Sequence, residues 1–188
     1  MVHFAGGQRK DWQPHMHGLE GMALLAAQCP DRWFPVLRLD GTPTGVQYGR
    51  WGDVLYCELP SGRRIAYHRP RVRDTGTWRG LELTYEGYNT NQKKGPPGWM
   101  TMPLYAGVLA NNVVQGTARD IQRHAILSLE RGGYPVVLHV YDEDVSEIPQ
   151  GWGSDTEFER LMGTMPAWAQ GWPIGLGDTW RGRRYRKA

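Results

Sequence analysis

Three consecutive carboxylates, Asp142, Glu143 and Asp144, lie between two runs of β-branched and apolar residues. The runs, Val136 to Val140 and Val145 to Ile148, favour two strands joined by a tight turn. Such a hairpin presents its carboxylates at one point, where like charges repel unless water or a divalent cation neutralises them. The sequence therefore allows two interpretations, a solvated acidic turn or part of a divalent-metal site.

A second set of polar residues follows the longest helical pattern, which we expect from about Pro103 to Arg131. Asn111, Gln115, Arg119 and Gln122 recur at spacings of four, four and three. Residues at these spacings share one side of a helix. An ordinary solvent-facing stripe and a ligand-contacting surface both fit this pattern.

Basic residues gather in two clusters that also contain aromatic residues. One contains Arg63, Arg64, Arg69, Arg71 and Arg73, and the other contains Arg181, Arg183, Arg184, Arg186 and Lys187. This combination fits a partner with a phosphate backbone. It fits a solvated basic surface equally well.

Composition limits the class of protein. The chain has 188 residues, of which 40% are hydrophobic and 22% charged, as in a globular protein with one substantial core or at most two small ones. No apolar run is long enough to span a membrane, and no signal peptide is expected. Cys29 and Cys57 have no metal-ligand spacing, so we expect buried thiols in a reducing compartment, the cytoplasm.

Several local patterns predict the elements that position these groups. A helix is expected at Leu19–Gln28, where Cys29-Pro30 ends it. Turn signals separate four short strand-like runs, which predict small antiparallel hairpins. The runs are Val46–Tyr48, Val54–Leu59, Arg64–Tyr67 and Leu81–Tyr85. The turn from Leu59 to Arg64 is expected to hold its arginines outward.

The rest of the chain gives weaker signals. Asn89 to Gly98 has the composition of a loop, and Gly132-Gly133 is a strong stop for the long helix. Ser154 and Glu157 form a capping pattern for a helix from about Asp155 to Met165. We expect its buried face to carry Phe158, Leu161 and Met162. Gly171 to Trp180 is predicted to be a last strand or extended segment.

Five motifs in this order resemble the C-terminal palm segment of phage-type family A DNA polymerases. They are Leu59–Arg63, Asn112–Ile121, Tyr141-Asp142-Glu143, Met165–Ala169 and Arg184–Lys187. The resemblance implies an α+β fold. In it, an antiparallel palm-type sheet carries a catalytic β-hairpin packed against a long helix, after small N-terminal β-hairpins.

The resemblance also implies a chemistry for the hairpin. Family A polymerases add a deoxynucleotide to a primer 3′-hydroxyl with two Mg²⁺ ions. Asp142 matches one of the two metal-binding aspartates, and Glu143 matches an auxiliary carboxylate. Asp144 is expected only to belong to the turn. A metal-dependent nuclease that uses all three acids is a weaker alternative.

Other matching residues are expected to bind DNA. Gln115 matches the family residue that reaches the minor groove of the new base pair, where acceptors occur on every correct pair. Asn111 lies one turn earlier and would follow the primer–template. Arg63 and Arg64 would contact phosphates, although this match is weaker. Tyr141 stands where the family usually has His at the primer terminus, and Asn111 replaces the usual Glu.

The family's first metal-binding aspartate and its fingers helix find no match in this chain. We therefore expect a single incomplete palm domain, divided into a post-fingers helix (1–30), a β-hairpin region (31–98) and a palm core with basic tail (99–188). A second polypeptide would complete this split polymerase, with primer–template DNA and dNTPs as substrates. Exposed-looking tryptophans (Trp12, Trp99, Trp152, Trp172) would suit a covered surface. The alternative is a non-catalytic DNA-binding or regulatory palm remnant.

Overall fold

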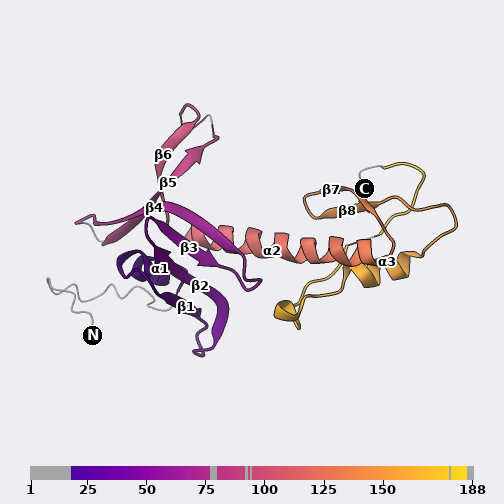
Figure 1. The fold of residues 1–188 in the computed structure, drawn as a ribbon, viewed down its shortest axis with the longest axis horizontal. Coiled ribbons are helices and arrows are strands. Elements are labelled where there is room, and N and C mark those ends of the chain that lie inside the picture. The colour runs from indigo at the N-terminus through magenta and orange to yellow at the C-terminus, as the bar shows by residue number, and fades with distance from the viewer. Residues whose placement is uncertain (1–17, 77–79, 92, 94, 178, 186–188) are drawn as a thin grey trace. The chain divides into compact units, whose positions relative to one another are not determined.

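The computed structural model describes residues 18–76, 80–91, 93, 95–177 and 179–185. These residues form a mixed α+β structure with three α-helices, a six-stranded antiparallel sheet and a two-stranded sheet (Figure 1). The chain divides into two compact units, residues 1–114 and 115–188. The single palm domain with segments 1–30, 31–98 and 99–188 stays a prediction. Trp12 lies outside the described residues.

Helix α1 (Leu19–Gln28) has the bounds that the sequence predicts. Leu, Met and Ala residues favour the helix, and Pro30 prevents it from continuing. The Arg50 guanidinium Nη1 donates a 2.7 Å hydrogen bond to the Ala27 carbonyl near the end of α1. A positive charge at this end complements the helix dipole. A residue of the sheet thus caps the helix that packs on it.

Six strands form one antiparallel sheet in sequence order. They are β1 (Trp33–Leu37), β2 (Pro43–Trp51), β3 (Val54–Glu58), β4 (Arg64–Asp74), β5 (Leu81–Asn89) and β6 (Gly98–Pro103). Each strand pairs with the next along the chain, so the predicted hairpins merge into one sheet instead of standing separately. The sequence patterns predict β2 to β5 and miss the two edge strands, β1 and β6.

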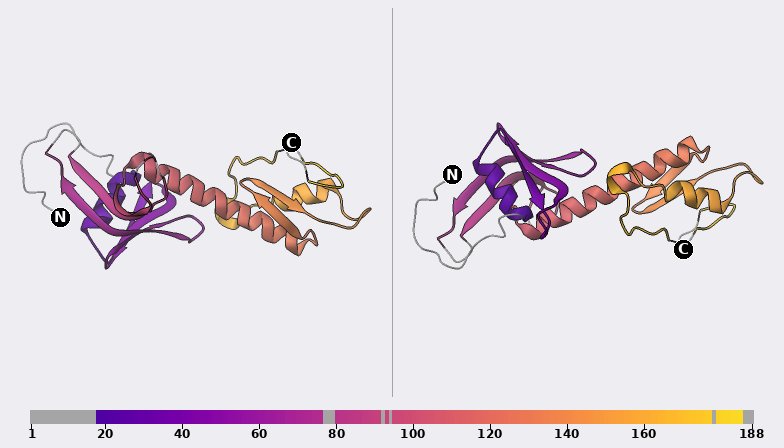
Figure 2. Two further views of the ribbon diagram at one scale, coloured as in Figure 1. Left: turned by 90° about the horizontal axis from the view of Figure 1, so that it is seen from above. Right: turned by 90° about the horizontal axis from the view of Figure 1, so that it is seen from below.

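Alternation along the strands gives the sheet two different faces. The inner face carries buried residues such as Tyr48, Leu55, Cys57 and Leu83, which pack with α1 in one hydrophobic core. Figures 1 and 2 show α1 beside the sheet from three directions. The opposite face, called here the outer face, carries Trp33, Trp51, Tyr56, His68, Tyr88 and Trp99.

Helix α2 (Ala106–Arg131) begins at Ala106 and not at the predicted Pro103. Pro103 instead ends β6, where it lies opposite Thr84. The helix ends as predicted, because Gly133 has a φ of 82° and the Tyr134 N–H returns to the Leu129 carbonyl at 3.0 Å. The boundary between the two units falls inside α2, between Val114 and Gln115.

The second unit contains the predicted hairpin as β7 (Val136–Val140) and β8 (Glu143–Ser146). It also contains helix α3 (Asp155–Met162) and a short 3₁₀ helix, η2 (Ala167–Ala169). Phe158, Leu161 and Met162 of α3 are half-buried. Gly163 caps α3, so this helix is shorter than predicted.

Of the two alternatives predicted for Gly171 to Trp180, a strand or an extended segment, the strand is not formed by the described residues. The described residues of this segment are irregular. Three glycines and Pro173 explain the difference, because glycine is a poor strand former and proline cannot donate to a ladder.

Candidate active site at the β7–β8 turn

Tyr141 and Asp142 form the two-residue turn between β7 and β8. Val140 pairs with Glu143 on either side of this turn. Tyr141 has a φ of 55°, in the left-handed region that side chains other than glycine adopt at a cost. Its side chain is 91% exposed. A strained, solvent-facing residue therefore stands directly before the aspartate that the sequence selects.

Asp142 and Glu143 are both exposed at this end of the hairpin. The Tyr185 hydroxyl donates a 3.1 Å hydrogen bond to Glu143 Oε2, which brings the C-terminal basic segment to the turn. This hydrogen bond to a carboxylate raises the pKa of Tyr185 above its ordinary value. Glu143 thus has a fixed neighbour, although Tyr185 lies 42 residues away in the sequence.

Asp144 is not a turn residue, which corrects the prediction. It lies in β8 and its side chain is buried, because successive strand residues point to opposite faces. Gln122 Nε2 donates a 3.1 Å hydrogen bond to Asp144 Oδ1, and Arg119 donates to Gln122 Oε1 at 3.0 Å. Burial raises the pKa of the Asp144 carboxyl, and the Gln122 hydrogen bond opposes this effect. Among the described residues, Asp144 Oδ2 has no hydrogen-bond partner.

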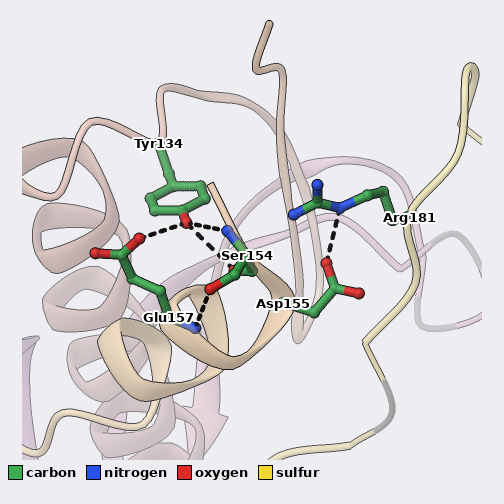
Figure 3. Close-up of polar contacts among 5 residues, drawn as sticks. All are labelled: Tyr134, Ser154, Asp155, Glu157 and Arg181. Carbon is green, nitrogen blue, oxygen red and sulfur yellow. Dashed lines mark hydrogen bonds and ion pairs between the residues drawn. The ribbon is translucent and has the colours of Figure 1, made fainter. Parts of the chain in front are cut away.

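Tyr134 anchors the segment after the hairpin, as Figure 3 shows. Its buried hydroxyl donates to Glu157 Oε2 at 2.9 Å and accepts from the Ser154 N–H at 2.9 Å. Ser154 Oγ accepts from the Glu157 N–H at 3.1 Å, which confirms the predicted cap of α3. An ion pair of 2.8 Å joins Arg181 Nε to Asp155 Oδ1. These contacts hold α3 and the basic segment in the same unit as the turn.

Gln115 and Asn111 are exposed on α2, as the polar stripe predicts. Gln122 leaves that stripe, because its side chain turns to the hairpin. Sequence reasoning passes over Asn112, whose Nδ2 donates to the Tyr67 hydroxyl at 2.9 Å and ties the start of α2 to β4. The spacing of four to Gln115 singles out Asn111, whereas no local signal in the sequence indicates that Asn112 contacts β4.

Arg63 and Arg64 lie at the predicted hairpin tip in the first unit. Gly62 has a φ of 82°, and the Leu59 N–H donates to the Arg63 carbonyl while the Leu59 carbonyl accepts from the Gly62 N–H, at 2.8 Å each. Both arginines are exposed. Arg64 Nε pairs with Glu58 at 2.7 Å, and its guanidinium lies 5.1 Å from the Trp33 ring centroid. Arg64 is thus held against the sheet, with part of its guanidinium in solvent.

The predicted residues therefore fall into two groups. Tyr141, Asp142, Glu143 and Gln115 belong to the second unit, whereas Asn111, Arg63 and Arg64 belong to the first. Within the described ranges, no three His, Cys, Asp or Glu side chains gather as a metal-binding group. No helix in that part of the chain is long and apolar enough to cross a membrane.

Comparisons with known proteins add an independent observation. Over 136 residues, which cover 70% of its length, the chain is 37% identical to a protein named DNA polymerase from Bacillus phage SP02. The aligned part covers 20% of that relative, so the chain spans about a fifth of the length of the polymerase it matches. No protein-family model and no solved structure matches the chain.

Proposed function

We propose that this chain is the C-terminal palm part of a template-directed DNA polymerase of the phage-type family A. The similarity to the Bacillus phage SP02 DNA polymerase carries the polymerase relationship, and the five ordered sequence motifs carry the family A palm assignment. The turn at Asp142 adds a chemical reason, since it presents two exposed carboxylates at the end of a hairpin. The substrates would be primer–template DNA and dNTPs.

Asp142 is the proposed Mg²⁺ ligand, with Glu143 beside it. Mg²⁺ prefers hard oxygen ligands and keeps water and substrate phosphates, so one or two protein carboxylates suffice. Exposed Asp and Glu oxygens fit this requirement. The bound metals would supply charge stabilisation to the attacking and leaving oxygens. Tyr185 donates a hydrogen bond to Glu143, and Asp142 stands in the turn that joins β7 to β8.

The remaining residues have binding roles in this proposal. Gln115 donates to the minor groove of the new pair, and Asn111 follows the primer–template one turn earlier. Tyr141 offers a phenol hydroxyl near the primer terminus. Arg63 and Arg64 present guanidinium N–H groups to phosphates from the hairpin tip.

A second polypeptide would supply the other metal-binding aspartate and the fingers. The apolar residues of β7 support a covered surface, because Val137, Leu138 and Val140 are 58%, 42% and 36% exposed. Contiguous patches of exposed apolar side chains often mark surfaces that bind a partner.

The test is primer extension by this chain combined with the polypeptide that co-purifies with it. We expect Asp142→Ala to lower extension on the order of a thousandfold or more. Glu147→Ala is the matched control, because Glu147 is an exposed carboxylate just beyond β8. Efficient extension by the reconstituted Asp142→Ala protein would disprove the assignment.

A non-catalytic DNA-binding remnant is the second candidate. The exposed basic residues of the C-terminal segment, Arg181, Arg183 and Arg184, favour it. In that case the isolated chain binds DNA with a strong salt dependence, neutralising the Arg181–Lys187 segment weakens binding, and Asp142→Ala has no effect.

A further inference from the structure

The outer face of the six-stranded sheet carries aromatic side chains in two clusters. In the first, the Trp33 and Trp51 rings are 4.6 Å apart and Tyr56 lies 6.3 Å from Trp51. A Cβ on Gly49 would overlap both tryptophan rings, so this glycine gives them room to lie against the strand. The two tryptophan rings therefore lie directly against the backbone of β2 at Gly49.

The second cluster is more exposed and is called here the Trp99 cluster. Tyr88 and Trp99 are cross-strand partners on β5 and β6, with ring centroids 6.0 Å apart. His68 of β4 meets Trp99 edge-on at 6.4 Å. Trp99 is 67% exposed and Tyr88 is 54% exposed. Both rings thus keep much of their surface in solvent at this edge of the sheet, and their planes meet at 87°.

The β5–β6 connection holds this pair in register. Asn89 is buried, and its Nδ2 lies 3.2 Å from the carbonyls of both Gly95 and Pro96. Its Oδ1 accepts from the Asn91 N–H at 3.0 Å. One buried amide therefore organises the turn directly after Tyr88 and before Trp99.

A pocket of about 540 Å³ opens beside the Trp99 cluster. Its lining residues are Asp53, Val54, His68, Arg69, Glu86 and Trp99. A β-bulge in β4 shapes it, because the pairing register shifts between His68 and Arg71 and Arg69 has a φ of 47°. Bulges redirect side chains and occur often beside binding sites. The volume is within the range of small-ligand sites.

Cross-strand ion pairs fix three arginines next to these rings. Arg69 and Arg71 pair with Glu86 at 2.8 and 3.6 Å, and Arg73 pairs with Glu82 at 2.7 Å. The three arginine side chains remain 64%, 72% and 74% exposed, so each guanidinium keeps N–H groups toward solvent. The glutamates balance much of their charge, which limits long-range attraction of phosphates.

We propose that the outer face at the Trp99 cluster binds single-stranded nucleic acid, with one base stacked on Trp99 and a neighbouring base on Tyr88. Exposed rings can stack only on unpaired bases, because the bases of a duplex already stack on each other. A protein partner fits less well, since the cores of protein interfaces are depleted of Asp and Glu, and this pocket contains Asp53 and Glu86. The proposal does not depend on polymerase activity.

Fluorescence anisotropy of the full chain with a labelled 12-residue oligothymidylate tests the proposal, without nucleotides or metal. We expect Trp99→Ala to weaken binding about tenfold or more, since stacking contributes strongly for each base. Trp99→Phe should restore most of the affinity, because it restores an aromatic face. Tyr105→Ala is the matched control, since Tyr105 is a 53% exposed aromatic residue of the same unit outside the outer face.

Salt dependence and competing ligands separate this site from other binding. The ratio of the wild-type affinity to the Trp99→Ala affinity should stay constant from low to high salt. Binding by a basic segment, in contrast, weakens as the salt concentration rises. An RNA oligomer of the same length shows whether the sugar matters, and a 12-bp duplex should bind more weakly at this face. Equal binding by wild type and Trp99→Ala, equal loss in Tyr105→Ala, or preference for the duplex overturns the proposal. The proposal is also overturned if oligonucleotides do not bind and a protein binds at Trp99 instead.

Discussion

The six-stranded sheet and the β7–β8 hairpin are both antiparallel, but they hold their residues in different ways. In the sheet, one face is sealed by α1, and Tyr48, Leu55 and Cys57 are fully buried. In the hairpin, β7 leaves most of its side chains exposed, and polar contacts supply much of the order. The sheet is thus stabilised by apolar burial, whereas the hairpin depends on a few specific hydrogen bonds.

The region that contributes most apolar burial is therefore different from the region that holds the candidate catalytic residues. A two-stranded hairpin is only marginally stable in water unless it packs on something else. The contacts of β8 with Gln122 and Tyr185 therefore matter more than a comparable contact in the sheet. Residues that could carry catalysis lie where the local structure depends most on neighbouring segments.

Core truncations should show the contrast most strongly. Leu55 is fully buried in the sheet, so Leu55→Ala should lower the free energy of unfolding of the first unit by about 2–5 kcal/mol. Leu138 is 42% exposed, so Leu138→Ala should change the stability of the second unit by only about 0.5 kcal/mol. Hydrogen exchange of β3 and β7 amides measures both. Similar losses would mean that the hairpin has a core of its own.

The hydrogen bond between Gln122 and Asp144 should rank next. Gln122→Ala leaves a buried carboxylate without its amide donor, which should cost about 1–3 kcal/mol. Hydrogen exchange of the β8 amides would report the loss. Arg123→Ala is a suitable control, because Arg123 is an exposed residue of the same helix. Unchanged protection in Gln122→Ala would show that this contact does not hold the hairpin.

The raised pKa of Asp144 adds a pH dependence with a defined sign. The folded chain holds the Asp144 proton more tightly than the unfolded chain does. Its contribution therefore favours folding at pH values below the ordinary aspartate pKa and is lost as the pH rises through the raised pKa. Asp144→Asn should remove this part of the pH dependence of the free energy of unfolding, which chemical denaturation at several pH values measures. The same pH dependence in Asp144→Asn as in wild type would contradict the prediction.

The turn itself should give the smallest effect. The left-handed φ of 55° strains the backbone at Tyr141, so Tyr141→Gly should stabilise the hairpin by about 1 kcal/mol. Tyr141→Ala keeps a Cβ and should gain nothing, which separates backbone strain from loss of the ring. Exchange rates of the Val140 and Glu143 amides measure the change. Faster exchange in Tyr141→Gly would show that the phenol ring stabilises the turn.

The sequence predicts elements whose signals are local. The bounds of α1 follow from its alanines and leucines and from Pro30, and α2 ends where Gly132-Gly133 requires. The hairpin is predicted from alternating apolar runs around three acids. The edge strand β1 is missed because Pro35 weakens the strand pattern, although an edge tolerates a residue without an N–H.

The sequence does not predict contacts between distant segments. Asp142, Glu143 and Asp144 look alike in the sequence, and only the strand alternation and the approach of α2 separate the buried acid from the exposed ones. Tyr185 likewise reaches Glu143 across 42 residues. The Trp99 cluster depends on cross-strand register, which short apolar runs do not specify.

Gln122 and Asp144 also carry a consequence for how such chains diverge. Each is the other's hydrogen-bond partner in a partly enclosed place, so a change of one alone leaves a polar group without its match. Replacement of both by apolar residues of similar size would be tolerated far better. Evolution from a polar pair to an apolar pair at these two positions should therefore proceed by paired substitutions. Related sequences should carry either two polar or two apolar residues at these positions, and mixed pairs should be rare.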